Sequence, residues 1–250
     1  MEINNSNPNF VILGAGGGIG RSVSKILHKG GAKIALLTRR KESIQDFADT
    51  LGALNISADA TSFEEVENGL TQVLERFGRI DGVVNCVGSL LLKSAHTTSY
   101  DEWKHTIDTN LGSSFATVRA VAKVAKKDAS VILLSSAAAQ VGVVNHEAIA
   151  AAKAGIIGLA RSAAATYASR NLRFNCIAPG MVDTPLTEII TKNEMALKGS
   201  VAMHALGRIG GPDEIARAIA FFLSPDQSWI TGQVLSIDGG LSRVRTRAKI

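Results

Sequence analysis

Short apolar runs alternate with longer amphipathic segments along nearly the whole chain. The apolar runs are rich in Val, Ile and Leu on both faces, which is typical of the buried strands of a parallel sheet. They predict strands at 10–14, 33–37, 53–57, 81–87, 130–135, 172–178 and 233–237. Segments with one charged face predict helices at 19–29, 62–77, 101–126, 146–169 and 212–223. This alternation predicts a doubly wound α/β fold, with helices on both faces of a parallel sheet of seven strands.

No Pro-, Ser- or Gly-rich linker divides the chain, so we expect one domain over residues 1–250. The first nine residues are polar and have neither the basic start nor the apolar run of a signal peptide. We see no apolar stretch that approaches the ~20 residues needed to cross a bilayer. The two cysteines, Cys86 and Cys176, lie in apolar runs without metal-ligand spacing, which suits a reducing compartment. We therefore expect a cytoplasmic protein with no membrane partner and no metal site.

The net charge of +5 is concentrated in a basic C-terminal tail, residues 241–250. Four positive charges lie in its last eight residues, at Arg243, Arg245, Arg247 and Lys249. The rest of the chain is close to neutral, and no aromatic-rich basic motif accompanies the tail. We therefore expect no nucleic-acid partner.

A glycine-rich turn directly follows the first predicted strand and precedes a helix. It comprises Gly14, Ala15, Gly16, Gly17, Gly18, Ile19 and Gly20. Glycine permits positive φ and leaves room for a pyrophosphate to reach the backbone amides. The following helix N-terminus offers free N–H groups and the positive end of its dipole. The turn and its context predict dinucleotide binding by a Rossmann fold.

The end of the second predicted strand indicates which dinucleotide is bound. A carboxylate there would accept hydrogen bonds from the ribose of NAD, whereas arginine suits the 2′-phosphate of NADP. The chain has Thr38, Arg39 and Arg40 at this place, and two guanidiniums can hold a phosphate through charge-assisted bonds. NADP(H) is therefore preferred and NAD(H) is possible. The alternative is an exposed basic loop whose arginines pair with Glu42.

These features resemble the short-chain dehydrogenase/reductase family, and the resemblance covers nearly the whole chain. Gly14, Gly18 and Gly20 match the family's glycine turn, although Leu13 stands where Thr is usual. The further cofactor-site matches, in chain order, are Asp59 and Ala60 near adenine, Asn85 and Gly88 of a degraded Asn-Asn-Ala-Gly motif, and Pro179, Gly180, Val182 and Thr184 at the nicotinamide. Residues 230–240 resemble the family's C-terminal strand.

The resemblance implies hydride transfer between a nicotinamide and a carbonyl or alcohol. In the family, a Ser positions the substrate oxygen and a Tyr donates the proton. A Lys four residues after the Tyr lowers its pKa and binds the nicotinamide ribose. Ser136 (or its neighbour Ser135, which the motif register disfavours) and Lys153 match these positions, and Asn110 matches the Asn that holds a water chain. However, Ile149 stands where the Tyr is expected, and isoleucine has no proton to give.

His146 is the candidate replacement for the missing proton donor. If Asn145 caps the helix, residues 146, 149, 150 and 153 share one helical face, so His146 points toward the same cleft as Lys153. Histidine titrates near neutrality and is a good general acid. Glu147 points about 100° away on a helix and is the weaker candidate. The alternative is that His146 only borders the pocket or faces solvent.

Two functions remain open at this point. The first is an atypical NADP(H)-dependent oxidoreductase with a non-Tyr proton donor, which the joint presence of Asn110, Ser136 and Lys153 favours. The second is a catalytically inactive NADP(H)-binding scaffold, sensor or partner subunit, in which Lys153 is retained to hold the ribose.

Apolar residues predict the nature of the substrate. Residues 185–206 occupy the place of the family's substrate lid, and their Met, Ile and Leu side chains predict a small, apolar substrate together with residues 90–92 and 141–144. The resemblance also implies a homotetramer built through the helices at 101–126 and 146–169 and the C-terminal strand. A dimer is the alternative.

Overall fold

The computed structural model describes residues 7–245, and its centre is one parallel sheet. The strand order is β3-β2-β1-β4-β5-β6-β7, and every neighbouring pair is parallel. The strands are β1 (Asn9–Leu13), β2 (Lys33–Thr38), β3 (Leu54–Ser57), β4 (Gly82–Asn85), β5 (Ser130–Leu134), β6 (Arg173–Pro179) and β7 (Val234–Ile237). The order reverses between β1 and β4, which opens a crevice at the carboxyl ends of these two strands.

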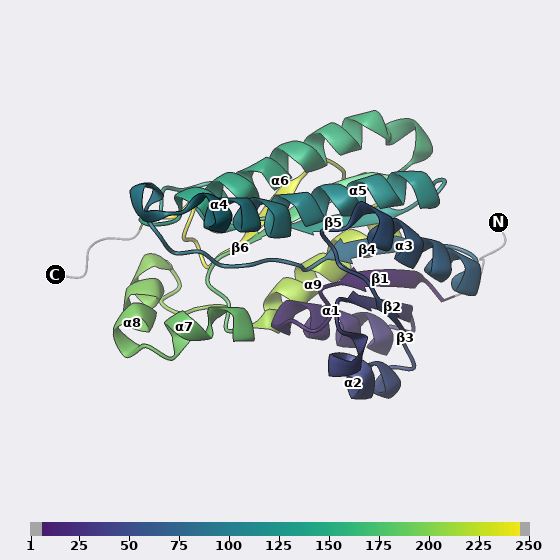
Figure 1. The fold of residues 1–250 in the computed structure, drawn as a ribbon, viewed down its shortest axis with the longest axis horizontal. Coiled ribbons are helices and arrows are strands. Elements are labelled where there is room, and N and C mark those ends of the chain that lie inside the picture. Colours follow the sequence, from purple (N-terminus) through teal and green to yellow (C-terminus); the bar gives the residue numbers. More distant parts are fainter. Residues whose placement is uncertain (1–6, 246–250) are drawn as a thin grey trace.

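Helices cover both faces of the sheet, as Figure 1 shows. On one face lie α1 (Gly18–Lys29), α2 (Gln45–Thr50) and α9 (Pro212–Leu223). On the other lie α3 (Phe63–Phe77), α4 (Tyr100–Ile107), α5 (Ser113–Val124) and α6 (Glu147–Thr166). Two short helices, α7 (Glu188–Thr191) and α8 (Glu194–Met203), form a small lobe at the left of Figure 1. The structure confirms the predicted doubly wound α/β fold, and the seven strands match the predicted runs to within two residues at either end.

Three helical predictions need correction. The helix expected at 101–126 is α4 and α5, joined by a π-helical turn at Asp108–Gly112. The helix expected from His146 begins at Glu147, because His146 has non-helical φ and ψ of −114° and 12° and itself occupies the N-cap position. Asn145 is therefore not the cap, and its φ of +60° places it in a left-handed turn. Helix α2 was not predicted, because its six residues are too few to show a helical period.

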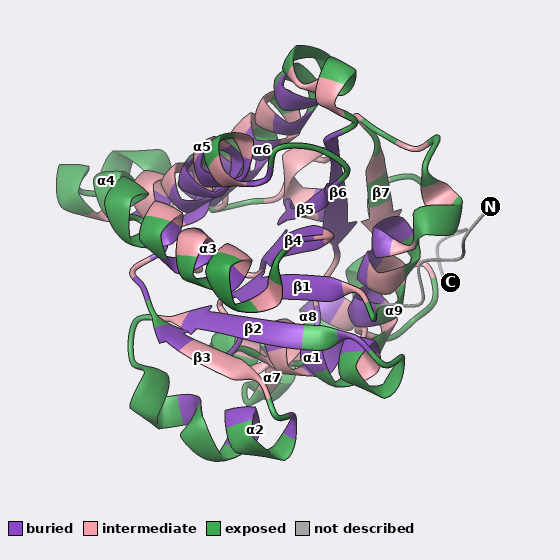
Figure 2. Cartoon of the chain, turned by 90° about the vertical axis from the view of Figure 1, so that its right-hand side faces the viewer, coloured by how far each residue is buried: buried purple, intermediate pink, exposed green. Residues whose placement is uncertain are grey.

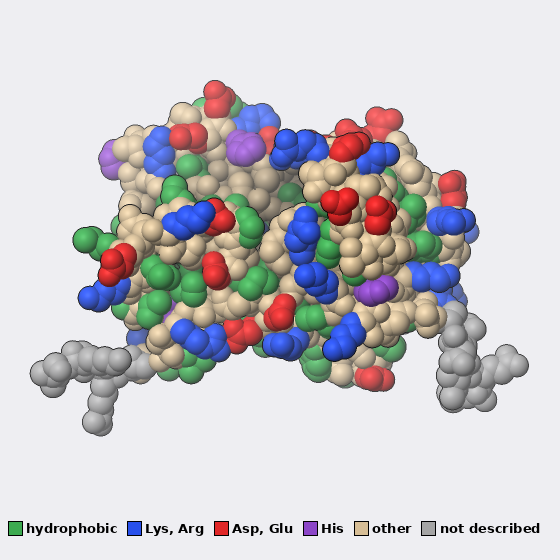
Figure 3. Space-filling view, turned by 90° about the horizontal axis from the view of Figure 1, so that it is seen from below, with side chains coloured by type: hydrophobic (Ala, Val, Ile, Leu, Met, Phe, Trp, Pro, Cys, Tyr) green, Lys and Arg blue, Asp and Glu red, His purple; other side chains and the backbone are tan. Residues whose placement is uncertain are grey.

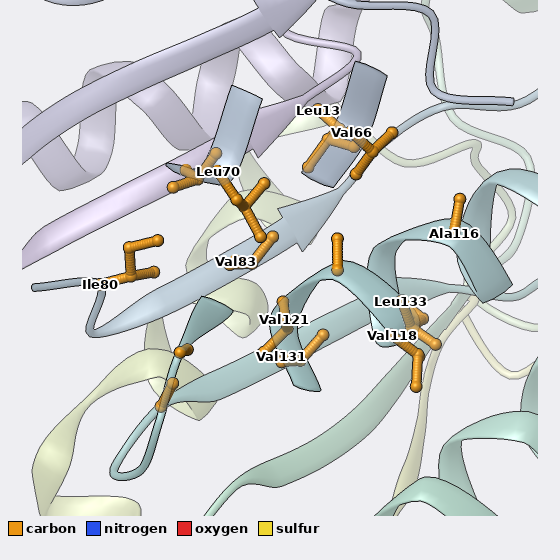
Figure 4. Close-up of a cluster of buried hydrophobic side chains, with 14 of the residues drawn as sticks. Leu13, Val66, Leu70, Ile80, Val83, Ala116, Val118, Val121, Val131 and Leu133 are labelled. Carbon is orange, nitrogen blue, oxygen red and sulfur yellow. The ribbon is translucent and has the colours of Figure 1, made fainter. Parts of the chain in front are cut away.

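Two apolar clusters hold the layers together, one on each face of the sheet. Figure 2 shows the contrast between the buried inner strands and the edge strands β3 and β7, which are largely of intermediate exposure. One cluster joins the sheet to α3, α5 and α6, and Figure 4 shows its part between α3, α5 and the strands, including Leu70, Val83 and Val121. The other joins the opposite face to α1, α2 and α9. These clusters fix the strand ends that carry the site.

Helix α6 departs from the expectation of no membrane-length apolar stretch. Its 20 residues are long and apolar enough to cross a bilayer by length and composition alone. In the structure it packs against β6, and Ile156 and Ala160 on its inner face are buried in the core. Its apolar character is therefore explained by packing within the domain.

Leu70 tests the packing of α3 on the sheet. Its side chain is fully buried, so Leu70→Ala is expected to lower the free energy of unfolding by about 2–5 kcal/mol, through lost transfer energy and a residual cavity. Met195→Ala is the control, because Met195 is 84% exposed and its truncation leaves no cavity. Urea unfolding of both variants measures the effect, and equal stabilities would contradict this description of the core.

Candidate active site

The glycine turn after β1 packs closely against the segment that follows β4. The Gly14 amide donates to the Leu37 carbonyl at 3.1 Å. Gly14 has a φ of +73°, and a Cβ at this position would lie 2.8 Å from the backbone nitrogen of Val87. A side chain at Gly14 is therefore excluded twice, by backbone conformation and by the neighbouring chain.

The first turn of α1 opens toward the crevice without a side-chain cap. Its N-cap residue is Gly17, so the first N–H groups of the helix receive no side-chain hydrogen bond. A Cβ at Gly18 would lie 2.8 Å from Cγ2 of Thr184, which places Thr184 directly beside this helix N-terminus. Gly20 packs just as closely on the Gly14 carbonyl. Exposed backbone amides and space limited to glycine form a cradle that fits the pyrophosphate of a dinucleotide.

Arg39 and Arg40 extend from the end of β2, and both are exposed. Neither forms an ion pair with any acidic group in residues 7–245, so the alternative of a basic loop paired with Glu42 does not occur there. Asp59 lies close to Arg39. Partial burial opposes its ionisation, but hydrogen bonds from Thr61 and the charge of Arg39 hold the pKa of its carboxyl below the ordinary value. Ala60, beside it, is buried.

The side chain of Asn85 forms hydrogen bonds within the fold. Its amide nitrogen donates to the hydroxyls of Ser113 at 3.3 Å and Thr117 at 3.1 Å, and its oxygen accepts from the Val87 amide at 2.8 Å. These bonds tie the end of β4 to α5. Gly88 then passes close to the catalytic candidates, since a Cβ there would lie 3.1 Å from Oδ1 of Asn110 and 3.4 Å from Nζ of Lys153.

Asn110 lies in the π-helical turn and is fully buried. Its Nδ2 donates to the Thr106 carbonyl and to the Ser89 hydroxyl, each at 2.9 Å, and its Oδ1 accepts from the Ser89 amide at 3.2 Å. The π-helical turn interrupts the predicted long helix at this residue. Asn110 thus anchors the loop after Gly88.

Lys153 projects from α6 into the crevice. It is 8% exposed, and its Nζ donates to the Leu134 carbonyl at 2.9 Å. Burial disfavours the ammonium form and lowers the pKa of Lys153 to about 8. The Ser135 hydroxyl donates to the Lys153 carbonyl at 2.8 Å, and this bond ties the segment after β5 to α6. The Ser136 hydroxyl accepts from the Ala138 amide at 3.2 Å and borders the pocket.

One pocket brings most of the predicted catalytic side chains together. Ser136, His146, Ile149 and Lys153 all line it, whereas Asn110 lies behind Gly88 and Ser89. Ile149 is 5% exposed, so its side chain fills part of the wall. His146 is held by a contact of 2.7 Å between its Nδ1 and the Val144 carbonyl, and its Nε2 has no hydrogen-bond partner in residues 7–245.

Some of the residues predicted to bind the cofactor, and some of those predicted to form an apolar substrate pocket, also line this pocket. Ile19, Gly88, Pro179, Gly180, Val182 and Thr184 line it. Of the apolar candidates, Leu90, Val143, Leu186 and Met203 do so. Ile189 and Met195 instead face outward, and Figure 3 shows the hydrophobic side chains gathered at the left end of that view, over α7 and α8. The lid region is therefore only partly turned toward the pocket.

Comparison with known proteins identifies the family. The family model described as enoyl-(acyl carrier protein) reductase matches residues 14–242. The chain is 34% identical over 238 residues to the 3-oxoacyl-(acyl-carrier-protein) reductase FabG of Salmonella typhimurium, covering 94% of this chain and 97% of that protein. It is 36% identical over 251 residues to the FabG of Chlamydia muridarum, covering 94% and 98%. The chain belongs to the short-chain dehydrogenase/reductase family.

Solved structures of short-chain dehydrogenases/reductases share the whole fold. A family member from Brucella melitensis superposes with a TM-score of 0.88 at 32% identity, covering 94% of this chain and 97% of that chain. The actinorhodin polyketide ketoreductase, solved with NADPH, gives a TM-score of 0.89 at 24% identity, covering 95% and 98%. The relatives are named as reductases, so this chain is a member of an oxidoreductase family.

Two pocket residues of this short-chain dehydrogenase/reductase were not assigned from sequence. Cys86 borders the pocket, and burial raises the pKa of its thiol to about 12, so it is an unreactive group. His204, at the end of residues 185–206, is 4% exposed, and both of its ring nitrogens contact backbone atoms. No helical or strand period singles out His204, because it follows the last turn of α8.

The buried amine of Lys153 gives a pH-dependent prediction. The pKa of Lys153 is about 8 in the folded protein and near 10.5 when unfolded, so the unfolded state binds more protons between these values. The burial penalty is fully present below pH 8 and disappears as the pH rises toward 10.5. Relative to Lys153→Met, the wild type should gain stability on the order of 1 kcal/mol or more across this range.

Denaturant unfolding at neutral and alkaline pH measures this gain, with exposed Lys25→Met as the control. A constant stability difference between wild type and Lys153→Met at all pH values would contradict the buried environment of the amine.

Proposed function

We propose that this protein is an NADP(H)-dependent oxidoreductase that transfers hydride between the nicotinamide and a carbonyl or alcohol, with His146 as the proton donor. The observation that carries the proposal is the position of His146. It lines the same pocket as Ser136, Ile149 and Lys153, and its Nε2 is without a partner in residues 7–245. The family membership supports the reaction type.

The glycine cradle, the arginines after β2 and the Pro179–Thr184 segment are suited to hold NADP(H). When bound, the cofactor supplies the hydride. Arg39 and Arg40 would hold the 2′-phosphate, Asp59 the adenine, and Thr184 the phosphate near the start of α1. Lys153, whose Nζ lies beside Gly88, would hold the nicotinamide ribose. Arg39 and Arg40 form no ion pair within residues 7–245, and the chain has no carboxylate at their position, which favours NADP(H) over NAD(H).

The chemistry of the pocket leaves His146 as the best proton donor. The thiol of Cys86 has a pKa raised to about 12 and gives up its proton too reluctantly. His204 uses both ring nitrogens in backbone contacts. Lys153 is engaged with the Leu134 carbonyl at 2.9 Å. Among these groups, His146 alone has an imidazole with a nitrogen that has no hydrogen-bond partner in residues 7–245.

The contact to Val144 determines how His146 acts. A carbonyl oxygen only accepts, so Nδ1 carries a proton and donates it to Val144. Nε2 is then the atom that exchanges a proton with the substrate. In reduction, the imidazolium gives the Nε2 proton to the developing alkoxide, which Ser136 positions. In oxidation, neutral Nε2 accepts the alcohol proton.

We propose an apolar carbonyl compound as substrate, and a 3-oxoacyl thioester as the first class to test. The pocket wall is largely apolar, with Val87, Leu90, Leu134 and Val143 beside Ile149. The FabG relatives are named for reduction of 3-oxoacyl groups, which makes this the class suggested by similarity. An acyl chain would lie against these side chains and bury apolar surface.

We further propose a homotetramer in the cytoplasm, with a dimer as the alternative assembly. Large apolar side chains are exposed on the outer face of α4 and α5, at Tyr100, Trp103 and Phe115. Trp229, before the edge strand β7, is 97% exposed. Such surfaces favour burial against further copies of the chain.

The basic C-terminal tail is described only in part. Arg247 and Lys249 lie outside the described residues. Arg243 donates a hydrogen bond to the Gln140 side chain at 3.0 Å.

The arginines after β2 give a cofactor prediction. Arg39→Ala with Arg40→Ala should weaken NADPH binding by about tenfold to a hundredfold and leave NADH binding nearly unchanged, because only NADPH carries the 2′-phosphate. Titration of cofactor fluorescence measures both affinities. Lys25→Ala on the exposed side of α1 is the control. Equal loss of NADH and NADPH binding would contradict the assignment.

His146 and Ile149 give the catalytic prediction. His146→Gln should lower kcat for reduction by about 10²–10⁴-fold without changing NADPH affinity, because it removes the acid and not the cofactor site. Ile149→Tyr in the His146→Gln background should restore turnover, since it returns a phenol to the wall beside Lys153.

Steady-state kinetics with NADPH measures these effects, and His105→Gln, outside the pocket, is the control. If His146→Gln is as active as the wild type, His146 is not the donor. If the wild type binds NADPH but turns over no carbonyl compound, the inactive NADP(H)-binding scaffold or sensor takes its place.

A further inference from the structure

His204 is a buried polar side chain whose tautomer is fixed by its surroundings. Its Nδ1 lies 2.7 Å from the Ser200 carbonyl, and its Nε2 lies 3.1 Å from the Met181 amide nitrogen. The carbonyl can only accept and the amide can only donate. Nδ1 therefore carries the proton, Nε2 is an acceptor, and the ring is neutral in this arrangement.

The ring fills a junction between three segments. It follows α8 at the end of the lid, residues 185–206, and touches the Pro–Gly segment, residues 179–184. A Cβ at Gly180 would lie 2.7 Å from Nε2, and one at Gly239 would lie 3.5 Å from Cδ2. Backbone without side chains thus surrounds the imidazole on both sides. Movement of the ring would displace the lid end relative to the Pro–Gly segment.

His204 also forms part of the pocket wall. Met181, Met203 and Leu241 line the pocket with it. It also borders a second recess, whose lining includes the charged side chains of Arg208, Glu214 and Asp238. The ring therefore lies between the apolar pocket and these charged side chains. Its bond to Met181 holds this wall, together with the bond from the Leu206 amide to the Gly239 carbonyl at 3.0 Å.

We propose that His204 is a positioning residue whose neutral ring holds the lid against the Pro–Gly segment and thereby sets how tightly the pocket binds substrate. This inference deepens the proposed function and rests on it for the identity of the pocket. Protonation of Nε2 places an N–H against the Met181 N–H, so the bond is lost. Substrate affinity then falls as the pH falls, and the effect is on KM.

The charged groups around His204 come from each segment that packs on it. Burial opposes the ionisation of Asp238, after β7, but hydrogen bonds from Ser242 and Gly240 lower the pKa of its carboxyl. Arg208 and Glu214 form an ion pair at 2.8 Å and largely balance one another. The other ionisable residues that line the pocket with His204 are Cys86, His146 and Lys153. Asp238 is thus the counter-charge for a protonated His204.

Amide hydrogen exchange at Met181 tests the proposal without any turnover. The structure predicts a protected Met181 amide in the wild type and about tenfold or faster exchange in His204→Leu, which has no acceptor. His204→Gln should retain protection, because its side-chain oxygen reaches about as far as Nε2. His96→Gln, on an exposed turn outside the pocket, is the matched control.

Kinetics with NADPH and a short 3-oxoacyl thioester gives the second readout. His204→Leu should raise KM about tenfold with little change in kcat, and His204→Gln should keep the wild-type KM at neutral pH but lose its rise on acidification. Unchanged Met181 exchange in His204→Leu, or an acid-dependent KM in His204→Gln, would overturn the proposal. If the wild type shows no turnover, the proposed function fails, and the exchange experiment alone decides the role of His204.

Discussion

The close contact between the glycine turn after β1 and the chain after β4 is the constraint on which the site depends. A Cβ at Gly14 would lie 2.8 Å from the Val87 nitrogen, so these two segments meet backbone to backbone. That contact places the open N-terminus of α1 on one side of the crevice and Gly88, with Asn110 and Lys153 behind it, on the other. The Pro–Gly segment then closes the crevice, because Thr184 packs on Gly18.

The sequence predicts the scaffold well because the scaffold depends on local patterns. Buried parallel strands are apolar on both faces, so the seven strands are visible as apolar runs. The glycine turn is visible because only glycine satisfies its backbone and its contacts. The break at Asp108–Gly112 is not visible, since a π-helical turn has nearly the same amphipathic pattern as a continuous helix. The start of α6 was also misplaced, because Asn145 resembles an N-cap but adopts a left-handed turn.

The contacts of the site side chains could not be predicted from the sequence, because they form only in the folded protein. Ser135 and Ser136 are adjacent and chemically alike, yet Ser135 bonds the Lys153 carbonyl while Ser136 borders the pocket. His204 is distant in sequence from Met181 and meets it only in the folded protein. The pocket therefore combines recognisable cofactor features with a proton donor that must be inferred from contacts. Ile149 forms part of an apolar wall at the position where the family resemblance implies a tyrosine. His146 is the N-cap residue of the same helix, α6.

Mixing wild-type protein with NADPH and then adding a panel of apolar ketones, aldehydes and short 3-oxoacyl thioesters tests the central claim most directly. Cofactor fluorescence reports binding first and oxidation second, and NADH run in parallel reports cofactor preference. We predict saturable NADPH binding, followed by loss of the signal with at least one carbonyl compound. Saturable binding without oxidation across the panel would contradict a functioning oxidoreductase, and failure to bind either nucleotide would contradict the cofactor site itself.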